Sequence, residues 1–380
     1  MRSASEPSRR LTLHLAGSLA LFHAMLLLGL LNASALTLMT YNVAGNGVED
    51  WSTNSPQVQA IGRQMQYLQP DIVTFQEIPF TNTWQMANFV AAYLPGYYLA
   101  TNSGTDGYIR SVIVSRFPIV RSRKWLDGVG LTNFGFNGWF TRDLFEAEIA
   151  VPGFAQPLHV FTTHLKSGQD TNSAARRAAE ASAISNYFVT AFLTTNATRP
   201  YVLTGDLNED VNRSTNDTVR RIANRATGLV LTTPRNPVTG DERTISIRTS
   251  LFARYDYILP CTLLASNITW CQVFRTDVIT NPPPPLLTTD SRTASDHLPV
   301  LMAFANPYTA PFKLLSITVT NGQVSLTWES VPAMKYSVET STNLIAWTRL
   351  ATNLTATSMT ITFSTNAARH AQYFRIHRTQ

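Results

Sequence analysis

Five apolar, strand-like runs in this 380-residue chain each carry, at one end, side chains that could bind a metal ion or move a proton. In the last of them, Asp296 and His297 stand directly before the apolar stretch 298–304. The other four runs end in the following groups: Asn42, Gln76-Glu77, His164, and Asp206 with Asn208. A charged group at the end of a buried strand needs a partner or a metal ion, because burying an unpaired charge is costly. The pattern therefore predicts one site assembled from the ends of several strands.

The side chains at these strand ends favour a hard divalent cation. Asp206 and Asn208 are two residues apart, so on an extended segment both side chains face the same way. Oxygen ligands of this kind suit Mg²⁺ or Mn²⁺, which keep several waters and use few carboxylates. A zinc site is not expected, because the chain holds only two cysteines and seven histidines.

Each of these residues also has a plainer interpretation. Asn42 could cap a turn towards Gly45, and an Asp-His pair is often only solvated. His159 and His164 share one predicted strand but differ by five positions, so their side chains point to opposite faces. His164, at the end of the strand, is the functional candidate, and His159 is interpreted as structural.

Two arginines in strand-like settings, Arg110 and Arg142, could contact phosphate oxygens. Each could equally make an ordinary surface contact or ion pair.

The elements that must position these residues alternate irregularly between strand and helix. Strands are predicted at 36–43, 71–77, 108–120, 143–151, 158–164, 201–207, 255–259 and 298–304, and helices at 55–69, 83–94, 173–193 and 215–226. Hairpin-like strand pairs occur among them, which a strict βαβ repeat would not contain. The pattern predicts an α/β sandwich of two packed sheets with helices outside, rather than a doubly wound parallel sheet.

The composition changes after Asn306-Pro307, where helical periodicity disappears. Short β-rich runs are predicted at 323–328, 335–340, 347–351, 358–363 and 373–376. Strands at this spacing indicate a small β-sandwich. We therefore expect a domain at 36–305, a linker at 306–313 and a β-sandwich module at 314–380.

The first 35 residues have the pattern of a secretory signal peptide. Arg9 and Arg10 precede an apolar stretch at 11–31, and Ala33-Ser34-Ala35 supplies small residues at the cleavage position. This pattern predicts export, with Leu36 the first mature residue; an uncleaved membrane anchor is the alternative.

The two cysteines, Cys261 and Cys271, are close in sequence. In an exported protein they are a plausible disulfide, and two free thiols are the alternative.

Composition describes a globular chain with a mild preference for anions. Hydrophobic residues make up 44% and charged residues 14%, which excludes a disordered chain. The formal net charge is +6, and all basic residues except four lysines are arginine. Arginine suits phosphate oxygens better than lysine does, although an arginine-rich genome would give the same bias.

Taken in order, the segments Thr40-Tyr41-Asn42-Val43, Gln76-Glu77, Gly205-Asp206-Leu207-Asn208 and Ser295-Asp296-His297 resemble the signature of the endonuclease/exonuclease/phosphatase superfamily, which includes DNase I-like nucleases and bacterial sphingomyelinases. The resemblance covers about residues 36–305. It implies a four-layered α/β/β/α sandwich and Mg²⁺-dependent (or Mn²⁺-dependent) hydrolysis of a phosphoester.

The resemblance also implies roles for individual residues. Asn42 and Glu77 would hold the metal, with Asp296 as a further ligand. Asp206 would align or deprotonate the attacking water, and Asn208 would bind a phosphate oxygen. His297, oriented by Asp256, would donate to the phosphoryl group. His164 would assist the phosphate or the leaving group.

The C-terminal segment 336–344, with Trp347 and Tyr373-Phe374-Arg375-Ile376, resembles a fibronectin type III-like module of exported bacterial proteins. This resemblance implies nothing about activity.

These observations predict a secreted, metal-dependent phosphodiesterase whose favoured substrate is nucleic acid. A phospholipase C-type enzyme acting on a lipid headgroup is the alternative, because Phe134, Phe136, Trp139 and Phe140 could meet a membrane surface or lie in the core. A non-catalytic binding protein on the same scaffold is a third hypothesis, and the presence of every expected polar residue argues against it. No protein partner is predicted.

Overall fold

A computed structural model describes residues 35–213, 217–367 and 372–379. The predicted signal peptide lies outside these residues, except for Ala35. Within the described ranges, no helix combines the length and the apolar character needed to cross a membrane.

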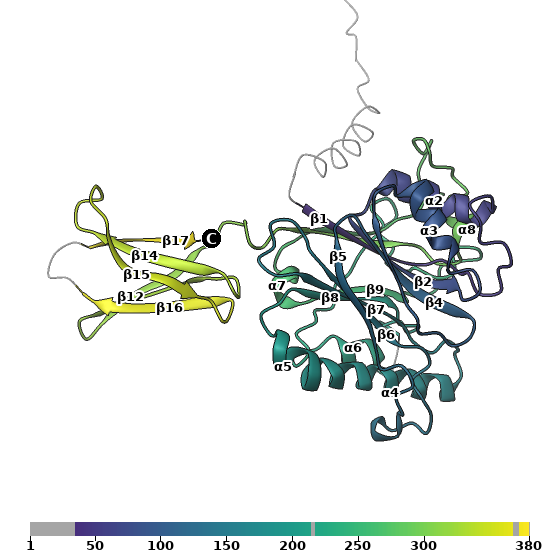
Figure 1. Cartoon of the computed structure of the whole chain (residues 1–380), viewed down its shortest axis with the longest axis horizontal. Helices are drawn as coiled ribbons and strands as arrows, with labels where there is room; N and C mark the ends of the chain where they lie inside the picture. Colours follow the sequence, from purple (N-terminus) through teal and green to yellow (C-terminus); the bar gives the residue numbers. More distant parts are fainter. Residues whose placement is uncertain (1–34, 214–216, 368–371, 380) are drawn as a thin grey trace, which may run out of the picture. The chain divides into compact units, whose positions relative to one another are not determined.

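Two mixed β-sheets form the centre of the larger, N-terminal part (Figure 1). The first has the strand order β10-β11-β1-β2-β4-β3, formed by β1 (Ala35–Asn42), β2 (Ile72–Pro79), β3 (Tyr98–Thr101), β4 (Ile109–Ser115), β10 (Ile268–Val273) and β11 (Val300–Ala305). The second has the order β5-β6-β7-β8-β9, formed by β5 (Ile119–Trp125), β6 (Leu144–Ile149), β7 (Leu158–His164), β8 (Tyr201–Asp206) and β9 (Asp256–Pro260). The pairs β1–β2 and β7–β8 are parallel, and the pairs β2–β4, β6–β7 and β8–β9 are antiparallel.

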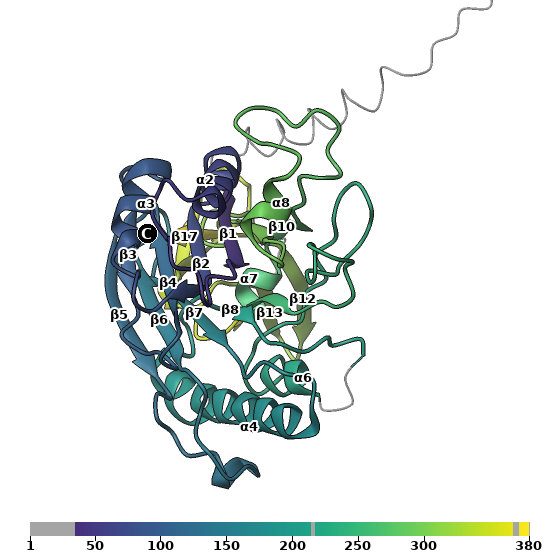
Figure 2. The same ribbon diagram turned by 90° about the vertical axis from the view of Figure 1, so that its right-hand side faces the viewer.

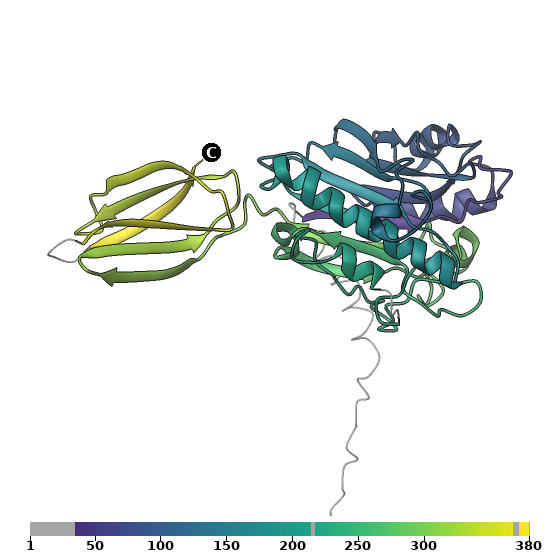
Figure 3. The ribbon, with the colours of Figure 1, turned by 90° about the horizontal axis from the view of Figure 1, so that it is seen from below.

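Helices cover the outer faces of the two sheets. Those on the first sheet are α2 (Pro56–Leu68), α3 (Gln85–Tyr93) and α8 (Asp290–Ala294); those on the second are α4 (Thr171–Tyr187), the π-turn η2 (Phe188–Phe192), α5 (Leu193–Asn196) and α6 (Thr218–Ile222). Figure 2 shows α2 and α3 on one side of the strands and α4 and α6 on the other, and Figure 3 shows the teal helix α4 lying across the second sheet. The predicted four-layered α/β/β/α fold is confirmed.

Local sequence explains where the main helices begin and end. Helix α2 has Pro56 at its first turn and ends at Gln69, whose left-handed conformation (φ 43°) lets its N–H reach the carbonyl of Met65. Helix α4 begins at Asp170, whose side chain accepts a hydrogen bond from the N–H of Ser173. The helix predicted at 215–226 is shorter than expected, since α6 ends at Ile222.

Strand alternation divides the side chains of β1 between two environments. Met39, Tyr41 and Val43 belong to the core cluster shared with α2 and α3, whereas Leu38 belongs to the cluster between the sheets. Asn42 shares the face of Leu38. The end of β1 therefore points a polar side chain into the space between the sheets.

The C-terminal part consists of two antiparallel three-stranded sheets. One contains β12 (Leu314–Thr320), β13 (Gln323–Glu329) and β16 (Thr360–Asn366), and the other β15 (Thr348–Thr355), β14 (Lys335–Ser341) and β17 (Tyr373–Thr379). Its own buried cluster includes Leu326, Trp328 and Tyr336. The predicted all-β sandwich is confirmed, with the additional strand β12; the fibronectin type III-like resemblance and the domain limits stay predictions.

The predicted disulfide between Cys261 and Cys271 is not formed. Cys261 directly follows β9 of the second sheet and is buried, whereas Cys271 lies in β10 of the first sheet and is half-buried. Their sulfur atoms take different partners, the N–H of Tyr201 and the carbonyl of Thr233. The two thiols are free because the chain crosses from one sheet to the other between them, although they are close in sequence. The short connection α7 (Thr262–Ala265) separates them.

Candidate active site

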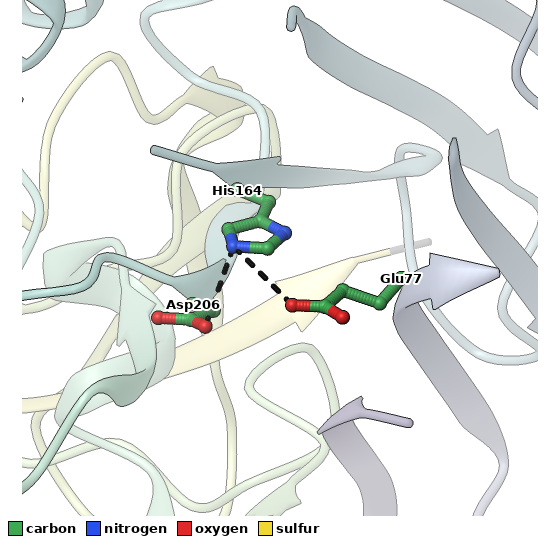
Figure 4. A group of neighbouring side chains, drawn as sticks. All are labelled: Glu77, His164 and Asp206. Carbon is green, nitrogen blue, oxygen red and sulfur yellow. Dashed lines mark ion pairs between the residues drawn. The ribbon is translucent and has the colours of Figure 1, made fainter. Parts of the chain in front are cut away.

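Two groups of acids and imidazoles meet between the carboxyl ends of β1, β2, β7 and β8, and they share Asp206. In the first, Nε2 of His164 lies 3.9 Å from Oε1 of Glu77 and 3.5 Å from Oδ2 of Asp206 (Figure 4). In the second, Nδ1 of His297 lies 2.8 Å from Oδ2 of Asp256, and its Nε2 lies 3.6 Å from Oδ2 of Asp206. The structure therefore brings five of the predicted residues into one buried cluster.

Strand register explains why three of them are neighbours. His164 pairs with Asp206 in the parallel β7–β8 ladder, and Asp206 pairs with Asp256 in the antiparallel β8–β9 ladder. Side chains at paired positions lie on the same face of a sheet. This pairing requires glycine at position 205, because a Cβ added there would lie 1.9 Å from the carbonyl oxygen of Thr163.

Glu77 reaches the site through an irregularity in β2. Regular alternation would turn its side chain to the face of Phe75, towards the helices. The ladder with β4 shifts register between Phe75 and Ile78, and Glu77 itself has φ 60°, a strained conformation for a residue other than glycine. The bulge therefore turns the carboxylate of Glu77 back into the space between the sheets. Gly45 packs directly on this bulge, where its N–H donates to the carbonyl of Glu77.

Asn42 connects the two sheets. Its Nδ2 donates to Oε1 of Glu77 at 3.0 Å and to Oδ2 of Asp206 at 2.9 Å, while its Oδ1 accepts from the N–H of Ala44 at 3.0 Å. Asn42 thus caps the turn that follows β1, as its plainer interpretation expected, and it also holds both carboxylates. Its predicted role as a metal ligand stays a prediction, since its oxygen faces the backbone here.

Asn208 lies in the turn that follows β8. Its N–H donates to Oδ1 of Asp206 at 2.8 Å, and its Nδ2 donates to the carbonyl of Leu165 at 3.1 Å. It also lines a cleft together with Arg177 and Tyr255. None of the five cluster residues lines this cleft, and the predicted contact of Asn208 with a phosphate oxygen stays a prediction.

The two site histidines have opposite electrostatic surroundings. Burial by itself lowers the pKa of His297, but the charges of Asp256 and Asp206 outweigh it and raise the pKa to about 10. Burial, followed by the charges of Arg142 and His297, holds the pKa of His164 well below its usual value. His297 is therefore a cationic donor and His164 a neutral imidazole. Neither ring nitrogen of His164 has a hydrogen-bond partner among the described residues.

Asp206 lies between these two imidazoles. Burial raises the pKa of its carboxyl group to about 7, against the charge of His297 and the hydrogen bond from Asn42, which lower it. A carboxylate with this affinity for a proton can accept one from water near neutral pH.

The predicted arginines differ in their surroundings. Nη1 of Arg142 donates to the carbonyls of His164 and Leu165, and its Nη2 pairs with Asp106 at 2.9 Å. Arg142 thus supports the backbone that carries His164 and makes the ion pair of its plainer interpretation, and its contact with phosphate stays a prediction. The guanidinium of Arg110 lies 4.6 Å from the ring centre of Phe80 and makes no ion pair with any described residue.

Asp296 is half-buried and belongs to neither cluster. Its predicted metal contact stays a prediction. The neighbouring Ser295, for which no role was predicted, links two parts of the site. Its hydroxyl donates to the carbonyl of Asn42 and accepts from the N–H of His297. The only signal for this role in the sequence is the position of Ser295 directly before the Asp-His pair.

Comparisons with known proteins identify the family of the chain. The model of the Endonuclease/Exonuclease/phosphatase family matches residues 39–297. The chain resembles the solved structures of sphingomyelinase C from Streptomyces griseocarneus (19% identity, TM-score 0.50, covering 71% of this chain and 99% of that one) and of D. rerio TDP2 with a single-strand DNA product (16%, 0.48, 71% and 99%). An endonuclease/exonuclease/phosphatase from Bacteroides vulgatus is similar (18%, 0.49, 71% and 98%). At these identities the likeness concerns the fold alone. No curated protein sequence matches the chain.

The contact between Asp256 and His297 generates a first prediction. Asp256→Asn should lower kcat strongly, because an amide no longer stabilises the imidazolium or its orientation. His297→Ala should lower kcat as well, and the double variant should be little worse than the worse single variant. A double-mutant cycle measured on one phosphodiester checks this expectation. Losses that simply add would show that the two residues act independently.

Proposed function

Because the chain belongs to the endonuclease/exonuclease/phosphatase family, whose members are phosphoester hydrolases, we propose that it is a divalent-metal-dependent phosphodiesterase acting on nucleic acid. The observation that carries the reaction type is the buried cluster of Glu77, His164 and Asp206, formed by both sheets. Phosphoryl transfer needs an aligned nucleophile and stabilised charge, with little covalent chemistry. This cluster offers those groups and contains no serine or cysteine nucleophile.

The donor set fits Mg²⁺ or Mn²⁺. Glu77 and Asp206 offer carboxylate oxygens within 4.8 Å of each other and of the unpartnered imidazole nitrogen of His164. We propose Glu77 as the principal ligand, with Asn42 and Asp296 as further candidates. When bound, a divalent cation would neutralise negative charge on the phosphoryl oxygens.

The chain's own groups account for the remaining chemistry. Asp206 accepts a proton from the attacking water, whose oxygen forms the new bond to phosphorus as the bond to the leaving oxygen breaks. His297, held by Asp256, donates a hydrogen bond to the phosphoryl oxygens as their charge increases. Asn208 binds another of these oxygens, and the neutral His164 assists the phosphate or the leaving group.

Nucleic acid is favoured over lipid for two structural reasons. Arg110 lies opposite Ile78 in the β2–β4 ladder, one residue beyond Glu77, and its guanidinium is held against Phe80. A positioned guanidinium beside the site suits a neighbouring backbone phosphate. The aromatic segment proposed for a membrane contact does not form an exposed patch, because Phe140 is buried and Trp139 alone is strongly exposed.

The metal requirement is tested with a charge-neutral variant. Glu77→Gln keeps an oxygen that can accept from Asn42 but removes the negative charge. We expect kcat to fall by about 100-fold or more, as when one group that stabilises transition-state charge is removed. Exposed Glu49→Gln is the matched control and should keep full activity. Chelation should abolish turnover, and undiminished hydrolysis in excess EDTA would contradict the proposal.

The substrate class is tested on Arg110. Arg110→Ala should raise KM for an oligonucleotide on the order of tenfold, and should make log(kcat/KM) about one unit less dependent on log salt, because one phosphate contact is lost. Arg123→Ala is the control, since Arg123 also stacks on an aromatic ring, that of Trp125, but lies on β5 away from the site. Hydrolysis of sphingomyelin vesicles by the wild type, without cleavage of DNA or RNA at low salt, would favour the lipid alternative instead.

We also propose that the protein is exported after cleavage before Leu36, on the basis of the small residues at 33–35. N-terminal sequencing of protein recovered outside the cytoplasm should begin at or near Leu36. Recovery of a chain that still begins at Met1 would contradict this proposal.

A further inference from the structure

A layer of buried polar side chains joins the two sheets directly behind the site. The interior of a sandwich is normally apolar, because a buried polar group costs free energy unless it is hydrogen-bonded. Here five such side chains meet, each with no exposed surface: Thr40, Thr74, Gln76, Thr162 and Thr204. We call this set the polar seam.

The seam contains direct hydrogen bonds from one sheet to the other. Nε2 of Gln76 donates to Oγ1 of Thr162 on β7 at 2.9 Å, and it lies 3.1 Å from Oγ1 of Thr40 on β1. The hydroxyl groups of Thr74 on β2 and Thr204 on β8 are 2.8 Å apart. Strand β2 is therefore joined to both β7 and β8 by side chains that require a defined distance.

The positions of the seam residues follow those of the site residues. Thr162 lies two residues before His164, and Thr204 two residues before Asp206, so each pair shares a face. Thr40 stands in the same relation to Asn42. Gln76 directly precedes the bulge that turns Glu77 inwards. Asn42, Glu77, His164 and Asp206 thus each lie one pleat or less beyond a member of the seam.

We propose that Gln76, acting with Thr162, is a positioning unit that sets the separation between the two halves of the site. One half, Asn42 and Glu77, comes from the first sheet, and the other, His164 and Asp206, comes from the second. The contacts between the halves are only 2.9 to 3.9 Å long. A displacement of about 1 Å can cost on the order of 100-fold in rate. The expected effect on hydrolysis rests on the proposed function.

The first test removes the amide of Gln76 while keeping its length. Gln76→Met should lower kcat for bis(p-nitrophenyl) phosphate by about 10- to 100-fold, while KM for this small diester changes less than about twofold, because no binding group is removed. Gln64→Met is the matched control. Gln64 is also fully buried, but its amide contacts Tyr41 and Ala60 on the helix-covered face of the first sheet. It should lose stability and keep its kcat.

The second test distinguishes the effect of the Thr162 hydroxyl group from the effect of its side-chain volume. Thr162→Ser keeps the acceptor for Gln76, and Thr162→Val keeps the volume. If the seam positions the site, kcat should follow the hydroxyl: the serine variant stays near wild type and the valine variant falls with Gln76→Met. If kcat instead follows the melting temperature across all four variants, the seam is only structural and the proposal is overturned.

A readout that needs no turnover separates this inference from the proposed function. The ring resonances of His164 in NMR spectra should shift in Gln76→Met and stay in place in Gln64→Met. If the wild type hydrolysed no phosphodiester, the proposed function would fail while this spectral difference would still support the seam. Unchanged His164 resonances in Gln76→Met would overturn the inference.

Discussion

The site depends on a single neutral amide that holds two carboxylates from different sheets. Glu77 and Asp206 repel each other when both are charged, and burial strengthens that repulsion because little water screens it. The two N–H groups of Asn42 each take one carboxylate oxygen, so the acids stay close without a direct contact. Ser295 in turn binds the carbonyl of Asn42. Four distant parts of the chain therefore meet at one asparagine, and a residue with fewer donors could not replace it.

The charges around this amide give the two imidazoles different chemistry. His297 lies between Asp256 and Asp206, which favour its protonated form, whereas burial and the charges of Arg142 and His297 favour the neutral form of His164. A permanent donor thus stands on one side of Asp206 and a neutral ring on the other. This difference comes from the neighbours, since both histidines are almost completely buried. It lets one carboxylate act beside two histidines without all three titrating together.

The sequence predicted the layers and most of the site because strand ends can be recognised from apolar runs and alternation. His164 and Asp206 follow from that logic, since regular pairing places them side by side, whereas Asp256, at the start of β9, was indicated only by the family resemblance. The direction of Glu77 could not be predicted, because a bulge depends on the pairing of β2 with β4 and leaves no local signal. The predicted pairing of Cys261 with Cys271 failed for the same reason, because the partners of these residues are set by tertiary packing rather than by closeness in sequence. The predicted signal peptide lies outside the described residues, so export stays a prediction.

The excess of arginine, which composition alone relates to anion binding, is largely used within the folded chain for ion pairs. Many of these arginines are neutralised by neighbouring acids, as in the pairs Arg63–Asp290, Arg243–Asp241 and Arg275–Asp277. Even the cleft beside Asn208 is lined by two arginines and two acids, so it has no net charge. A polyanion would therefore meet no broad positive field at this cleft. If the proposed substrate is correct, binding relies instead on a few oriented contacts, and Arg110, which lies opposite Ile78 and is stacked on Phe80, is placed to make one of them.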